Sequence, residues 1–157
     1  MISRKGHIFG KWLWSTVIAY CGSNWVACFI TKRLLTSYFV TLGRSPTSWK
    51  TKKQTTVLRS AAEAEYWALA IVTGGSIWVK SFLASLVIFL QDPIPLYCDN
   101  QAALPIVKNP VFDERTKHIK IDCRFIREYL ISGELMPKHL PSKYQLADIF
   151  TKALGKQ

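Results

Sequence analysis

Residues 48–70 read SWKTKKQTTVLRSAAEAEYWALA, and the spacing of apolar side chains changes within them. Before Arg59, the aromatic and β-branched residues of SWK and TTVL are typical of a strand, which we expect within residues 47–58. After Arg59, apolar residues recur at three- and four-residue intervals, as on one face of a helix. They are Ala61, Ala64, Ala68, Leu69 and Val72. The stretch therefore predicts a strand that leads into a helix, within a layered domain of both element types.

The flanking sequence extends this alternation in both directions. We expect the helix to break at Gly74 and Gly75 and to resume as a second helix through residue 90. Pro105 is expected to distort a later helix, and Gly133 to end another. The further elements that we expect are strands at residues 16–21, 37–42, 95–98 and 135–140, a helix at 118–132, and a last helix through 154 that a capping box at 142–145 opens.

Length and composition favour one folded domain that spans residues 1–157. Hydrophobic residues make up 49% of the chain and charged residues 20%, which excludes the composition of a disordered protein. The net charge is +11, and no Asp or Glu precedes Glu63. Such a basic chain favours a polyanionic partner, either the phosphate backbone of nucleic acid or an anionic membrane.

The cysteines and an uncharged segment indicate in which cellular compartment we expect the protein. The four cysteines form no CxxC pair, so we expect reduced thiols in an intracellular protein of the cytoplasm or nucleus, not a secreted one. Residues 12–31 carry no charge and could be a signal or a membrane span. Polar residues interrupt them, and buried strands joined by a polar turn explain the composition without a membrane.

Three carboxylates occupy positions that need an explanation. Glu65 lies on the apolar face of its helix, where a carboxylate must be paired, protonated or bound to a cation. Asp99 follows an apolar strand, where it is either a site residue or a helix cap. Asp148 is either a ligand or an ordinary acid near the start of the last helix. Together they suggest a site for hard divalent cations, which prefer oxygen ligands.

Five segments, in order and at matching spacing, resemble the ribonuclease H domains of copia-type retrotransposon Pol polyproteins. They are SWKTKKQTTVLRSAAEAEYWALA, PLYCDNQAAL, KNPVFDERTKHIKID, FIREYLISGEL and LPSKYQLADIFTKAL, and the resemblance covers about residues 19–154. It implies an α/β (α+β) ribonuclease H-like fold, with a five-stranded mixed sheet flanked by helices. It also implies Mg²⁺- or Mn²⁺-dependent cleavage of the RNA strand in RNA–DNA hybrids, beside a reverse transcriptase portion of the same polyprotein.

The resemblance assigns the metal-binding and catalytic acids by motif, and one of them is missing. Glu65 stands in AEAEY, Asp99 in YCDN and Asp148 in QLAD. The first acid, an Asp after a Tyr-Cys-like pair, is here Gly22, and a second Asp two residues later is Asn24. We therefore expect weakened metal binding and an inactive ribonuclease, or else a non-catalytic remnant that binds nucleic acid. Whether the protein counts as an enzyme stays open at this point.

Other residues are candidates for contact with the hybrid. His139 stands roughly where many ribonucleases H carry a histidine that assists product release, and His118 is expected to be structural or to face phosphate. Trp49 is expected to pack in the core rather than to stack on a base. Cys21 and Cys98 should be free thiols that point away from the site. The expected phosphate contacts are Lys50, Lys52, Lys53, Arg115, Lys117 and Lys120.

Overall fold

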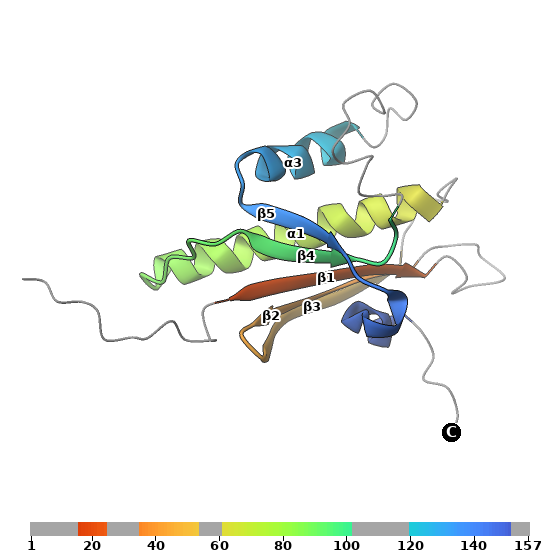
Figure 1. Cartoon of the computed structure of the whole chain (residues 1–157), viewed down its shortest axis with the longest axis horizontal. Coiled ribbons are helices and arrows are strands. Elements are labelled where there is room, and N and C mark those ends of the chain that lie inside the picture. The colour runs from red at the N-terminus through yellow and green to blue at the C-terminus, as the bar shows by residue number, and fades with distance from the viewer. Residues whose placement is uncertain (1–15, 25–34, 54–60, 102–119, 152–157) are drawn as a thin grey trace, which may run out of the picture.

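The computed structural model describes residues 16–24, 35–53, 61–101 and 120–151 (Figure 1). Five strands form one mixed sheet in the spatial order β3-β2-β1-β4-β5, as predicted. β2 runs antiparallel to both of its neighbours, β1 and β3, whereas β4 lies parallel to both β1 and β5. The strands are β1 (Val17–Asn24), β2 (Leu35–Leu42), β3 (Ser45–Lys53), β4 (Ile94–Cys98) and β5 (Leu135–His139).

The first three strands lie close to where the sequence predicts them. β1 begins one residue later than expected and extends to Asn24, β2 includes the whole expected strand, and β3 begins at Ser45, two residues earlier than expected. Residues 54–58, the rest of the expected third strand, lie outside the described residues. Gly43 connects β2 to β3 with a φ of 59°, a conformation that glycine adopts without steric cost. Its N–H donates to the carbonyl of Thr16 at 2.8 Å, which ties the turn to the start of β1.

Helix α1 (Ala61–Ser85) is continuous, so the expected break at Gly74 and Gly75 is wrong. A Cβ atom at Gly75 would lie 3.1 Å from the ring of Tyr38 in β2, whereas one at Gly74 would meet nothing within 4 Å. Gly75 thus allows the helix to approach the sheet closely. Packing of this kind outweighs the weak helix propensity of two glycines, which is about 1 kcal/mol each.

Both described helices end in the same hydrogen-bonding pattern but with different residues at the key position. At the end of α3 (Lys120–Ile131), Glu134 N–H bonds to Tyr129 and Gly133 N–H to Leu130, as in a Schellman motif. Gly133 has a φ of 73° and ends the helix as predicted. At the end of α1 the same motif places Val87 in the left-handed region, with a φ of 63°. A β-branched residue is strained there.

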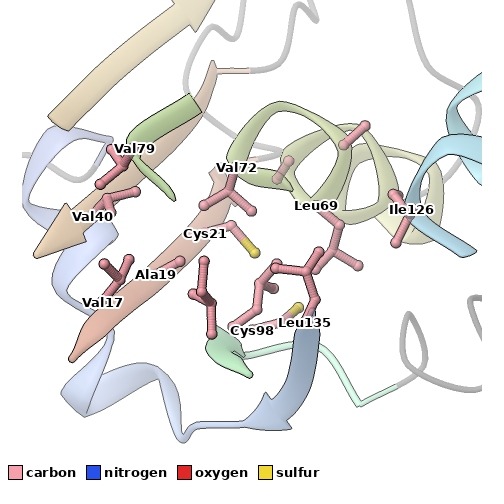
Figure 2. Packing of buried hydrophobic residues seen from close by; sticks show 14 of the residues in the cluster. Val17, Ala19, Cys21, Val40, Leu69, Val72, Val79, Cys98, Ile126 and Leu135 are labelled. Carbon is pink, nitrogen blue, oxygen red and sulfur yellow. The ribbon is translucent and has the colours of Figure 1, made fainter. Parts of the chain in front are cut away.

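The core lies between the sheet and helix α1 (Figure 2). Ala19 and Cys21 of β1 face Leu69 and Val72 of α1, and all four are buried. α3 packs beside α1, and its buried Ile126 extends this core. The segment Tyr66–Ser85 is long and apolar enough to cross a membrane, with a mean hydropathy of 1.4. In this fold its buried side chains are core contacts.

The last part of the chain differs from the expected helix. It forms two short 3₁₀ turns, η3 (Ser142–Tyr144) and η4 (Leu146–Phe150), and residues 152–154 lie outside the described residues. The predicted capping box does not form, because Ser142 is the first residue of η3, whose N-cap is Pro141, and Gln145 is the N-cap of η4. η4 packs against β1 and β2. Because Gly22 faces η4 while Cys21 faces α1, η4 covers the side of the sheet opposite to the core.

Candidate functional site

Three segments converge at the carboxyl ends of the two central parallel strands. Cys21 of β1 pairs with Cys98 of β4, so the residues that follow them, Gly22 and Asp99, reach the same edge of the sheet. Asp148 of η4 approaches this edge from the side opposite α1. A Cβ atom built at Gly22 would lie 3.0 Å from Oδ1 of Asp148, whose side chain is buried. The structure therefore places Asp148 directly against Gly22.

Asp99 is held at one carboxylate oxygen only. Ser142 Oγ donates to Asp99 Oδ2 at 3.0 Å, which gives Ser142 a role in place of the expected helix cap. Oδ1 of Asp99 is buried and has no hydrogen-bond partner among the described residues. A buried carboxylate oxygen without a donor is costly unless a cation binds it. Asp99 thus has the free oxygen that a metal ligand needs.

Two residues that sequence reasoning missed hold in place η4, the turn that carries Asp148 and is called the Asp148 turn below. The side chain of Gln145 donates from Nε2 to the carbonyls of Cys21, at 2.8 Å, and Tyr97, at 3.3 Å. Ser37 of β2 donates from Oγ to the carbonyl of Ala147 at 2.7 Å. Gln145 stands in the QLAD block, but the block alone does not indicate that its side chain points inward.

Aromatic rings support the same face of the sheet. Tyr20 stacks on Tyr97 with ring centroids 5.4 Å apart, and Phe150 of η4 lies 5.8 Å from the ring of Phe39. Partial burial, and to a lesser extent the neighbouring Tyr97, raises the pKa of Tyr20 above its ordinary value of 10.0. These contacts fix η4 on the sheet from its carboxyl end, as Gln145 does from its amino end.

Comparison with known proteins gives related sequences and similar folds. The chain is 41% identical over 138 residues to the retrovirus-related Pol polyproteins of transposons RE2 and RE1 from Arabidopsis thaliana. It is 34% identical over 121 residues to the Pol polyprotein of transposon TNT 1-94 from Nicotiana tabacum. These matches cover 88% and 77% of this chain and about a tenth of each relative. No protein-family model matches the chain.

Solved structures show the same fold at low sequence identity. LC11 ribonuclease H1, solved with an RNA/DNA hybrid, superposes with a TM-score of 0.60 at 14% identity and covers 85% of this chain and 92% of that one. The ribonuclease H domain of a Mycobacterium tuberculosis protein gives a TM-score of 0.58 at 10% identity, with 87% and 91% covered. The chain is a ribonuclease H-like domain of the copia-type Pol family.

In the ribonuclease H-like domain, Gly22 lies against Asp148, and Asp99 follows the neighbouring strand β4 at the same edge of the sheet. Glu65 belongs to α1, but its side chain lies outside the described residues, and so does that of Asn24 at the end of β1. The alternatives for Glu65 therefore stay open. Among the described side chains, no three His, Cys, Asp or Glu residues are placed to hold a metal ion.

The domain presents part of its predicted basic surface on the edge strand β3. Lys50, Lys52 and Lys53 are all exposed there. Trp49 is 56% exposed, so the expectation that it packs in the core is wrong, because β3 lies at the edge of the sheet. His139 is exposed at the carboxyl end of β5. Arg115, Lys117 and His118, and the side chain of Lys120, lie outside the described residues.

The two cysteines behave as predicted. Cys21 and Cys98 are buried thiols that form no disulfide with each other, and Figure 2 shows both on the core side of the sheet, away from η4. Their thiols donate to backbone carbonyls, Cys21 to Tyr97 at 3.6 Å and Cys98 to Asn100 at 3.7 Å. Neither thiol is therefore available as a ligand at the edge of the sheet where Asp99 and Asp148 lie.

Proposed function

We propose that this domain has the architecture of a metal-dependent nuclease for RNA–DNA hybrids and is itself catalytically inactive. The observation that carries the proposal is Gly22. It stands beside Asp148 and at the same edge as Asp99, where the resemblance expects the first carboxylate. Removing an anion that two cations would share lowers transition-state stabilisation, and we expect a rate loss of about a thousandfold or more.

The residues present fit a divalent cation only in part. Asp99 Oδ1 is a buried oxygen that receives no hydrogen bond within the described part of the chain, which suits a hard cation, and Asp148 supplies a second carboxylate nearby. Gly22 contributes no side-chain oxygen. In this class of site the cations activate water and stabilise the leaving oxygen. Asp99 and Asp148, with Glu65 as a further candidate, would hold them here with reduced affinity.

A second candidate function is binding of nucleic acid without cleavage. Lys50 and Lys52 are exposed on one face of the edge strand β3, Trp49 and Lys53 are exposed on its other face, and the whole chain carries a charge of +11. Phosphates attract such a surface, and an exposed aromatic ring offers a stacking platform. Hybrid binding that weakens steeply with salt, without cleavage, would support this function.

The partners and location follow from the family as proposals. The related sequences are Pol polyproteins, and a foamy virus protease-reverse transcriptase solved with an RNA/DNA hybrid shares the fold at a TM-score of 0.58 and 10% identity. We infer an RNA–DNA hybrid as ligand, a reverse transcriptase portion as neighbour, and an intracellular site of action.

The test is cleavage of a labelled RNA–DNA hybrid with Mg²⁺ or Mn²⁺. The native chain is compared with Gly22→Asp and with Gly22→Asp/Asn24→Asp, after folding of each protein is verified. Cleavage by a restored variant alone supports the proposal, and adding Asp99→Asn to that variant should abolish it. Cleavage by the native chain that Asp99→Asn removes would show that the surviving carboxylates suffice, so the chain would be active.

A further inference from the structure

Gln145 joins the two central strands where their own pairing ends. The register of β1 and β4 runs as far as Cys21 opposite Cys98. The amide of Gln145 donates to the carbonyls of Cys21 on β1 and Tyr97 on β4. Only 4% of the Gln145 surface is exposed, so water does not compete freely for these bonds.

The same side chain also begins the turn that carries Asp148. Oε1 of Gln145 accepts from the N–H of Ala147 at 3.3 Å, and the Gln145 carbonyl accepts from the N–H of Asp148 at 3.2 Å. Ser37 holds the other side of the turn through the Ala147 carbonyl. One glutamine thus connects β1, β4 and η4, the three segments that form the candidate site.

An amide is the group that this place requires. Its NH₂ supplies the two donors for the strand carbonyls, and its oxygen accepts from the turn. A glutamate carboxylate would present only acceptors to those carbonyls, and a leucine would leave them and the Ala147 N–H without this partner. A shorter asparagine keeps the amide but lacks one methylene of reach.

We propose that Gln145 is a positioning residue that sets the place of Asp148 against Gly22 and the ends of β1 and β4. The effect of Gln145 on cation binding rests on the proposed function, whereas its effect on the position of the Asp148 turn does not, because the turn forms without metal. One measurement tests the turn without metal, and a second tests cation binding.

The first measurement is amide hydrogen exchange by NMR without metal. In Gln145→Leu, and in the milder Gln145→Asn, we expect the amides of Ala147, Asp148 and Thr151 to exchange about tenfold faster or more relative to the sheet. Ser76→Ala is the matched control, because Ser76 is buried and donates to a backbone carbonyl, that of Val72, at 2.7 Å within α1.

The control should change the exchange of the Asp148 turn no more than that of the sheet. Unchanged protection of the turn in both Gln145 variants would overturn the proposal. A loss of protection from exchange that is uniform over the sheet and the turn would also overturn the proposal, because Gln145 would then stabilise the whole fold rather than the turn.

The second measurement is Mn²⁺ affinity in the Gly22→Asp background. With Gln145 present we expect saturable binding, and with Gln145→Leu about tenfold weaker binding by folded protein, whereas Ser76→Ala should bind as tightly as the reference. Equal affinity with and without Gln145 would refute the positioning role. If the reference itself binds no Mn²⁺, the proposed function fails, and hydrogen exchange alone decides the role of Gln145.

Discussion

Placing a carboxylate at Gly22 should make the stability of the protein depend on divalent cations. In Gly22→Asp the new Cβ lies 3.0 Å from Asp148 Oδ1, so two carboxylates would meet in a buried place. Two like charges about 4 Å apart repel by about 4 kcal/mol at an effective dielectric constant of 20. Rotation of Asp148 and sharing of a proton reduce this value, and we expect a loss of about 2 kcal/mol in unfolding free energy at pH 7.

Gly22→Asn is the matched control, because it has nearly the same shape without the charge. Both variants should bear the same steric cost against Asp148, so their difference isolates the repulsion. Urea unfolding in EDTA measures that difference. Saturating Mn²⁺ should then stabilise Gly22→Asp by about 3 kcal/mol at a hundred times its dissociation constant, and the same Mn²⁺ concentration should stabilise Gly22→Asn much less.

The pH dependence has a definite sign. Repulsion raises the pKa of one carboxyl of the pair in the folded variant, so lowering the pH through that value should stabilise Gly22→Asp relative to Gly22→Asn. Equal stability of the two variants in EDTA, together with no effect of Mn²⁺, would refute the placement of Asp148 against Gly22.

Three further predictions concern the described fold. Val87→Gly should raise the unfolding free energy by about 1 kcal/mol, because glycine relieves the strain at a φ of 63°; a lower stability in thermal unfolding would contradict this. Tyr20→Phe should reduce the loss of stability above pH 10, because a raised folded pKa, caused by burial and then by Tyr97, stabilises the fold below that pH and is lost as the pH rises. Alkaline unfolding curves that coincide for the two proteins would argue against it. Cys21 and Cys98 should resist maleimide in the native protein and react in denaturant, and a disulfide between them in mass spectra of reduced protein would show the placement to be wrong.

The sequence predicted which residues meet at the site better than how they are held. Apolar runs that end in Gly22 and Asp99 indicate strands, and parallel strands bring their carboxyl ends to one edge. Gln145 could not be recognised in this way, because a buried amide that serves two strand carbonyls has no local pattern. Ser142 gave a misleading local signal: its spacing fits a capping box, but its hydroxyl donates to Asp99, 43 residues away.

Local propensity also failed where packing decided the outcome. The two glycines of α1 predict a break, but the ring of Tyr38 packs where a side chain at Gly75 would lie, and the helix continues. Trp49 reads as a core residue by composition, yet β3 is an edge strand and leaves it exposed. The spacing of residues could not reveal either outcome. The unbroken helix depends on Tyr38, which is distant along the chain, and the exposure of Trp49 depends on the position of β3 at the edge of the sheet.

By itself, the sequence located the five strands and the helices α1 and α3, though not the unbroken course of α1 or the 3₁₀ turns near the end of the chain. The resemblance of five blocks in a fixed order implied the family and the mixed sheet, and it placed Gly22 where it expects the first carboxylate. Periodicity and motif blocks are read from neighbouring residues, so they need no tertiary structure. Only the tertiary structure decided that Asp148 lies against Gly22, that Asp99 keeps a buried oxygen to which no described residue donates, and that Gln145 joins both strands to the Asp148 turn. The physical reason is that hydrogen bonds and close contacts between remote segments form only when the whole chain packs, and no local pattern encodes their partners.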